Sequence, residues 1–137
     1  MRRAASITAA FIALQLILDV VLHFVRLHHK VGSGAVTLFN LVETLILGLL
    51  IVLWARERVT IALAAGALSG IVDVTIGLWL DRLVGEVPTG PQQQHPVAFA
   101  IAGLAILPVL VGIVSAAGAL AGVGIRRFFL DKASARA

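Results

Sequence analysis

The sequence predicts an all-α fold, in which a single polytopic membrane domain forms an up-and-down bundle of four transmembrane helices. Four apolar stretches fill almost the whole chain of 137 residues, and each has the roughly 20 residues that a helix needs to cross a bilayer. Hydrophobic residues make up 60% of the chain and charged residues 13%, against about 45–50% and about 25% in soluble domains. The chain has no Cys, which excludes disulfides, thiol catalysis and thiolate metal sites.

Polar residues separate the predicted helices. The helices are expected over residues 4–25, 36–55, 59–80 and 97–125. A polar loop is expected over residues 26–35, a tight turn over 56–58 and an irregular loop with three prolines over 81–96. Pro108 lies near the middle of the fourth helix, where its missing N–H predicts a kink.

The basic residues predict the orientation of the bundle. Eight of them are expected on the side of the two termini, namely Arg2, Arg3, Arg56, Arg58, Arg126, Arg127, Lys132 and Arg136. Three are expected on the other side, namely Arg26, Lys30 and Arg82. Because Lys and Arg concentrate in cytoplasmic loops, both termini are expected in the cytoplasm, with the protein in the cell membrane. Topology thus explains the net charge of +4, and no nucleic-acid partner is expected.

Three of the predicted helices carry a carboxylate at about the same depth. Asp19, Glu43 and Asp73 each lie about seven residues from the outer end of their helix. At about 1.5 Å per residue, all three are expected about 10 Å below the outer boundary. A charged side chain near the centre of a membrane helix costs about 2.5–3.5 kcal/mol. Three at one level predict an acidic pocket inside the membrane that opens outward.

Helical periodicity places these carboxylates on faces that are expected to avoid lipid. The first helix carries a polar stripe of Thr8, Gln15, Asp19, His23 and Arg26. The second carries a polar face of Thr37, Asn40, Glu43 and Thr44. The third carries a stripe of mostly small residues, Ala62, Gly66, Ser69, Gly70, Asp73 and Gly77, and the fourth a face of Pro108, Gly112, Ser115, Ala116, Ala119 and Gly122. Polar and small residues of this kind mediate contacts between membrane helices.

The carboxylates cannot all stay ionised close together without compensation. A proton, a basic side chain or a bound cation can neutralise their negative charge. The candidate binding site comprises Asp19, His23, Asn40, Glu43 and Asp73. Four of these offer one nitrogen and three oxygen donors, a set that suits a divalent metal ion, namely Asp19, His23, Glu43 and Asp73. In the alternative structural interpretation, Asp19 and His23 hold helices together, and Glu43 pairs with Arg26 or Lys30.

Three functions fit this pattern. The first is binding or transport of a small cation or an organic amine, taken up from outside by the acidic pocket. The second is a non-catalytic accessory role, in which the chain forms a homodimer or joins a partner membrane subunit. The third is acid–base catalysis by Asp19 and His23 on a lipid-like substrate. The chain has no nucleophile, nucleotide-binding or metal-hydrolase motif, so the first two functions are favoured over an enzyme.

Overall fold

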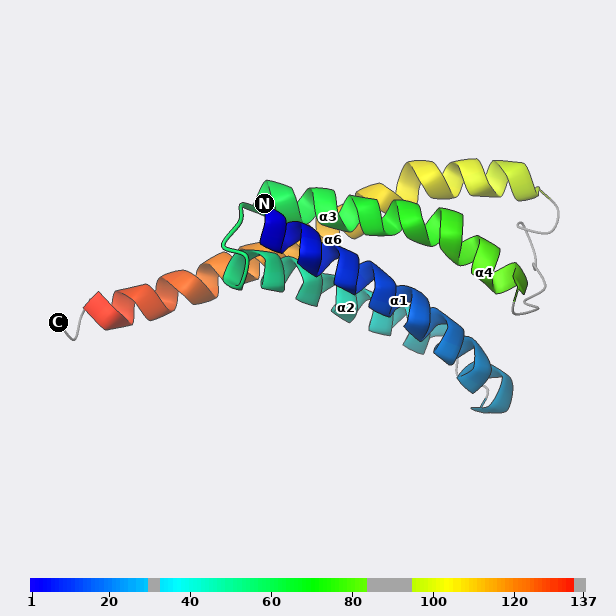
Figure 1. Cartoon of the computed structure of the whole chain (residues 1–137), viewed down its shortest axis with the longest axis horizontal. Helices are drawn as coiled ribbons and strands as arrows, with labels where there is room; N and C mark the ends of the chain where they lie inside the picture. The colour runs from blue at the N-terminus through cyan, green and yellow to red at the C-terminus, as the bar shows by residue number, and fades with distance from the viewer. Residues whose placement is uncertain (30–32, 84–94, 135–137) are drawn as a thin grey trace.

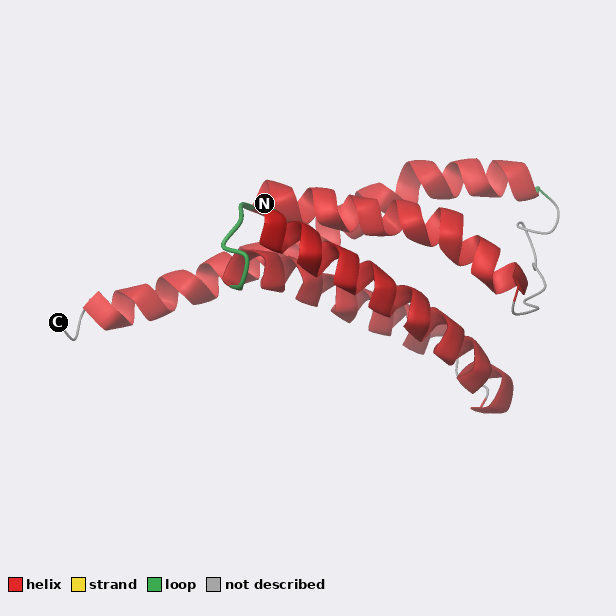
Figure 2. Ribbon diagram, in the orientation of Figure 1, coloured by secondary structure: helices red, strands yellow, loops and turns green. Residues whose placement is uncertain are grey.

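The computed structural model describes residues 1–29, 33–83 and 95–134, and its regular structure is helical throughout these ranges (Figures 1 and 2). The elements are α1 (Arg2–His29), α2 (Ser33–Leu53), α3 (Val59–Val72), the π-helical η1 (Asp73–Gly77), α4 (Leu78–Leu83) and α6 (Pro96–Ser134). Because α3, η1 and α4 follow one another without a break, the described chain forms four helical rods. The side chains outside the described part include those of residues 22–24, 26–29, 33–37, 77–78, 81–82, 96 and 130–134. The predicted all-α fold class is confirmed.

Three of the rods are long and apolar enough to cross a membrane. Their apolar stretches are Arg2–Val21, Val59–Ile76 and Val97–Phe129, with mean hydropathies of 2.0, 1.9 and 2.7. In α2 the described apolar stretch, Leu38–Leu53, is shorter. Large apolar side chains lie exposed on the outside of the rods, among them Ile17, Leu68 and Ile106. A helix bonds its interior backbone groups within its own segment, as a lipid environment requires. These features are those of a membrane protein.

The helices extend further than the sequence pattern predicted. α1 continues to His29 and α2 begins at Ser33, so most of the loop expected over residues 26–35 is helical. α4 ends at Leu83, inside the loop expected over residues 81–96; residues 84–94 of that loop lie outside the described part. α6 begins at Pro96, where a proline loses no intrahelical bond, and it continues to Ser134, well past the expected end. Hydropathy marks where a span leaves the hydrocarbon, but a helix can continue into water.

The core of the bundle lies where α6 packs against α2 and α3. Its most deeply buried apolar residues are Leu47, Ile51, Val52, Ala62 and Ala119. α6 shares far more contacts with α2 and α3 than α1 shares with any element. Along its length α6 changes direction (Figure 1), as expected for a helix with Pro108 inside it. α1 is therefore the most loosely held of the long helices.

Small residues bring α6 to backbone distance from its neighbours. A Cβ added at Gly48 of α2 would lie 1.7 Å from the carbonyl oxygen of Ser115 on α6. A Cβ added at Gly66 of α3 would lie 2.6 Å from the Cβ of the same serine. The Ser115 hydroxyl donates a 2.8 Å hydrogen bond to the Ala62 carbonyl oxygen. The small-residue faces expected on the third and fourth helices are thus confirmed as packing surfaces.

The third rod departs from the regular helix expected over residues 59–80. Its π-helical segment, η1, begins at Asp73, one of the three carboxylates that the sequence pattern predicted inside the membrane. The Thr75 hydroxyl donates hydrogen bonds of 2.8 Å to the carbonyl oxygen of Ile71 and 3.3 Å to that of Val72. These bonds help to satisfy carbonyls beside the change of helical register. Because π segments are rare and frequently occur at functional sites, η1 marks Asp73 as a distinctive position.

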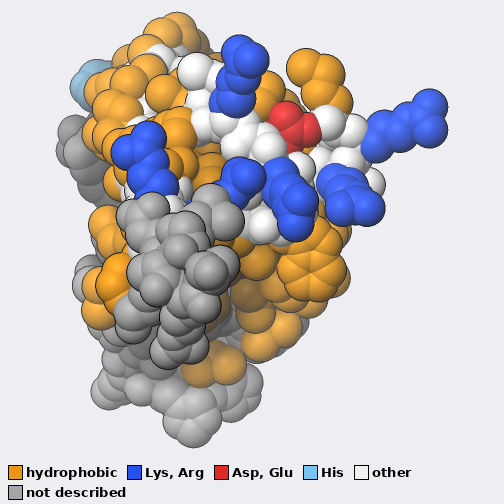
Figure 3. All heavy atoms as spheres, turned by 90° about the vertical axis from the view of Figure 1, so that its left-hand side faces the viewer, with side chains coloured by type: hydrophobic (Ala, Val, Ile, Leu, Met, Phe, Trp, Pro, Cys, Tyr) orange, Lys and Arg blue, Asp and Glu red, His pale blue; other side chains and the backbone are white. Residues whose placement is uncertain are grey.

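The basic side chains in the described part of the chain gather at one end of the bundle. The turn between α2 and α3 lies beside the N-terminus (Figure 1), where the N-terminal amine pairs with Glu57. Arg56 of this turn and Arg126 of α6 line one surface hollow. Figure 3 looks onto this end and shows its group of Arg side chains. We call it the basic end.

Candidate functional site

Glu43 lies on the face of α2 that is turned toward α1. Residues spaced by three or four positions on each helix line a shared groove of about 510 Å³. Five of them belong to α1, namely Ile7, Ala10, Phe11, Leu14 and Leu18. Five belong to α2, namely Phe39, Val42, Glu43, Ile46 and Leu50, and Trp54 follows directly after the end of α2. We call this the α1/α2 groove; Glu43 is the one ionisable residue among these eleven.

The carboxyl group of Glu43 is incompletely satisfied. Its Oε1 atom is buried and has no hydrogen-bond partner among the residues that the structure describes. The adjacent hydroxyl group, that of Thr44, donates instead to the backbone carbonyl oxygen of Asn40 at 2.8 Å. A buried polar atom without a partner costs about 1–3 kcal/mol, and more when the group is charged. A positively charged group bound in the groove would remove this cost.

The α1/α2 groove opens sideways, toward the surroundings of the bundle. Leu14, Phe39 and Val42 line it and are themselves substantially exposed, whereas Phe11 is buried. Apolar walls with one well-placed polar group, and a volume between about 300 and 1,000 Å³, are typical of sites for small organic molecules. The geometry therefore favours a ligand with an apolar body over a bare ion.

The polar stripe of α1 is turned toward α3 at its central position. The Ser69 hydroxyl of α3 donates a 2.6 Å hydrogen bond to Oε1 of Gln15 on α1. Ser69 is buried and Gln15 is half-buried. The expectation that this stripe faces a neighbouring helix is confirmed at Gln15, and the bond ties α1 to the core. The side chains of His23 and Arg26, further along the stripe, lie outside the described part.

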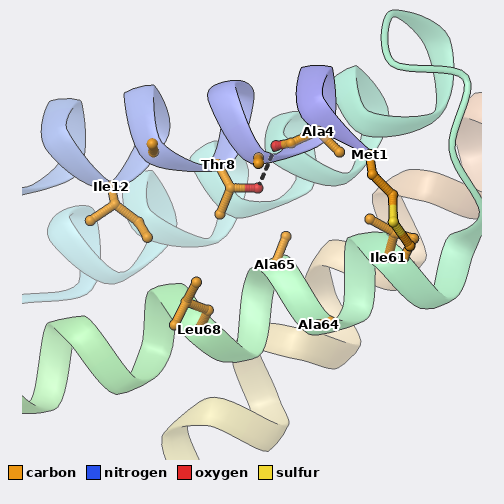
Figure 4. Close-up of a pocket in the computed structure, with 10 residues that line it drawn as sticks. Met1, Ala4, Thr8, Ile12, Ile61, Ala64, Ala65 and Leu68 are labelled. Atoms are coloured by element: carbon orange, nitrogen blue, oxygen red, sulfur yellow. Dashed lines mark hydrogen bonds between the residues drawn. The ribbon is translucent and has the colours of Figure 1, made fainter.

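A second crevice separates the first half of α1 from α3 (Figure 4). It has a volume of about 380 Å³, and its lining is almost entirely apolar. Thr8 lies within it, but its hydroxyl donates to the carbonyl oxygen of Ala4 on the same helix at 2.8 Å, the dashed line in Figure 4. The crevice is therefore not a continuation of the predicted acidic pocket toward the basic end.

The other two carboxylates lie on elements that meet. Asp19 is half-buried on α1, and Asp73 is half-buried at the first position of η1; α1 contacts η1 directly. Within the described part of the chain, no three His, Asp or Glu side chains come together to hold a metal ion. Asp19, Glu43 and Asp73 thus form no metal site by themselves. A metal site that includes His23 stays a prediction, because that side chain lies outside the described part.

The sequence pattern pointed to Glu43 but missed the apolar residues around it. On α1 they recur at the helical spacing from Ile7 to Leu18, which is the one signal that the sequence contains. Lipid-facing residues show the same spacing and the same hydropathy. Only the position of α2 distinguishes a groove wall from a membrane-facing surface.

No family model, curated protein or solved structure matches this chain.

Proposed function

We propose that this chain is a four-span protein of the cell membrane, with both termini on the cytoplasmic side, that binds a lipophilic organic cation in the α1/α2 groove. The cation is an amine or onium group that pairs with Glu43, while its apolar body lies against the walls. The observation that carries the proposal is the buried Oε1 of Glu43, which has no partner among the described residues and lies in an apolar setting. The basic end supports the orientation, because basic residues concentrate on the cytoplasmic side.

The residues beside Glu43 support an organic cation. Phe39 lies one helical turn away on α2, and Phe11 lies on the opposite wall of the groove. Aromatic rings attract cations through their faces, and the attraction is stronger where water is excluded. An inorganic ion would gain little from such walls and would lose most of its hydration beside a single carboxylate. The sideways opening gives a lipophilic molecule a route from the membrane.

Transport of the bound cation extends this proposal. α1 is held by few contacts, whereas α2, α3 and α6 pack tightly. Movement of α1 against that core would open and close the groove, as in rigid-body gating of one bundle against another. Protonation of Glu43, Asp19 or Asp73 would weaken their attraction for the cation and so couple its release to a proton. Asp73 supports this role by its position at the start of η1.

A fluorescence titration tests the binding step. The chain has two Trp residues, and Trp54 lines the groove, so Trp79→Phe leaves the groove indole as the sole reporter. Tetraphenylphosphonium added to this variant in detergent is expected to change Trp54 emission in a saturable way. Glu43→Gln keeps the size of the side chain but removes its charge. We expect it to weaken binding by about 2 kcal/mol or more, roughly 30-fold in Kd.

Glu57→Gln provides the matched control. It removes the same charge, but at the basic end, where Glu57 pairs with the N-terminal amine. Its Kd for tetraphenylphosphonium is expected to equal that of the parent. Triphenylphosphine oxide, which is apolar and uncharged, is expected to bind far more weakly than the cation. Equal affinities for Glu43→Gln and Glu57→Gln would rule out the proposed role of Glu43.

A second candidate function is that of a non-catalytic subunit of a larger membrane complex. The last part of α6 projects beyond the other helices (Figure 1). A Cβ added at Gly124 would meet no atom within 4 Å, and Phe128 and Phe129 are exposed there. Purification distinguishes the two functions. A chain that stays monodisperse alone and binds tetraphenylphosphonium supports the first, whereas a chain that aggregates unless co-purified with a partner supports the second.

A further inference from the structure

A hollow at the basic end is formed by two helices and a turn. Its lining consists of Leu53 at the end of α2, Arg56 of the turn, and Ile125, Arg126 and Phe129 of α6, and its volume is about 360 Å³. The three α6 residues lie within about one helical turn of one another. Two guanidinium groups therefore stand beside three apolar side chains.

We propose that this hollow binds the phosphate group of an anionic membrane lipid. Arg56 and Arg126 contact the phosphate oxygens, and Leu53, Ile125 and Phe129 contact the beginning of the acyl chains. Guanidinium groups bind phosphate through paired, charge-assisted hydrogen bonds. A free phosphate ion would make no use of the apolar side chains, whereas a lipid needs both surfaces. The site is separate from the α1/α2 groove and does not depend on its ligand.

The charges in the hollow are not neutralised within the described part of the chain. Neither Arg56 nor Arg126 forms an ion pair with a carboxylate described there. Glu57, the acidic neighbour of Arg56, pairs with the N-terminal amine instead; the side chain of Asp131 lies outside the described part. Positive charges that converge on a concave surface attract an anion.

The backbone at Arg56 gives an independent reason to assign it a role. Its φ is 57°, in the left-handed region that glycine adopts readily and that other L-residues adopt rarely. The turn would therefore form more easily with glycine at this position. Strained residues of this kind are found at binding sites, where the surrounding structure holds them in place. Here the strained residue is one of the two arginines of the hollow.

Native mass spectrometry of the whole protein with added phosphatidylglycerol or phosphatidylcholine tests the proposal. Arg58 and Arg127 are exposed neighbours that do not line the hollow, so each lining arginine has a matched control. We expect Arg56→Gln and Arg126→Gln each to weaken phosphatidylglycerol binding by about tenfold or more. Arg58→Gln and Arg127→Gln are expected to change it by no more than about twofold, and phosphatidylcholine is expected to bind weakly to all five proteins.

Two further measurements separate lipid binding from folding and from simple anion binding. Arg56→Gly is expected to lose phosphatidylglycerol to the same degree as Arg56→Gln without a lower Tm, because glycine relieves the backbone strain. Inorganic phosphate is expected to leave the bound lipid in place. Equal losses in the Arg58 and Arg127 variants would overturn the proposal in favour of diffuse attraction, and displacement by inorganic phosphate would overturn the assignment to a lipid.

Discussion

Replacing Gly48 by Ala tests the packing that holds α2, and with it Glu43, in place. A Cβ at this position would lie 1.7 Å from the Ser115 carbonyl oxygen and 2.7 Å from the carbonyl carbon. Ordinary contacts of a Cβ lie at 3.4–4 Å. The obstructing atoms are backbone, so no side-chain rotation can relieve the clash. α2 and α6 must separate by more than an ångström.

The size of the effect follows from this separation. Overpacking a well-packed core typically costs about 1–3 kcal/mol, and a clash between two backbones belongs at the upper end. Membrane helices also associate mainly through close packing. Few other interactions can therefore compensate for the packing that is lost when α2 and α6 separate. We therefore expect Gly48→Ala to lower the free energy of unfolding by about 3 kcal/mol, measured by titrating the protein with SDS in mixed micelles and following Trp fluorescence.

Gly124→Ala is the matched control for this experiment. It makes the same substitution in α6, where an added Cβ meets no atom within 4 Å. Alanine favours a helix over glycine by about 1 kcal/mol, so this variant is expected to be unchanged or slightly more stable. If Gly48→Ala unfolded at the same SDS fraction as Gly124→Ala, the inference that α2 and α6 are in close backbone contact at Gly48 would be refuted.

Two further predictions concern polar groups of the bundle. The hydrogen bond from Ser69 to Gln15 is expected to show a coupling energy of about 0.5–1.5 kcal/mol in a double-mutant cycle of Ser69→Ala and Gln15→Leu, measured by SDS unfolding; a coupling of zero would mean that this bond does not hold α1. Asp73→Asn, which removes a charge from the start of η1, is expected to abolish uptake of a radiolabelled lipophilic cation into vesicles while the protein still inserts, and unchanged uptake would exclude Asp73 from the transport path.

Much of the helical framework could be predicted from the sequence, because apolar length and helical periodicity are local properties. The face that runs from Pro108 to Gly122 was predicted from spacing alone, and its residues pack against α2 and α3. The π segment at Asp73 could not be predicted, because nothing in its composition distinguishes it from an α-helix. The end of α6 was placed too early, because polar residues such as Arg126 end a span without ending a helix.

Less of the candidate site than of the helical framework could be predicted from the sequence. The depth of Glu43 and its place on a polar face follow from counting along the helix, but the groove depends on how α1 lies against α2. Leu14 and Val42 line that groove, although their sequence context is the same as that of a lipid-facing residue. In a membrane, hydropathy no longer separates buried positions from exposed ones. The environment of Glu43 is therefore a tertiary property.

Photochemical labelling tests most directly whether a lipophilic cation occupies the α1/α2 groove. A lipophilic amine that carries a diazirine would be irradiated with the protein in detergent, and the labelled residues identified by peptide mass spectrometry. We predict labels on residues that line the groove, such as Leu14, Leu18 and Val42, and their loss in Glu43→Gln but not in Glu57→Gln. Labels scattered over the outer faces of α3 and α6, or a pattern unchanged by Glu43→Gln, would contradict the account.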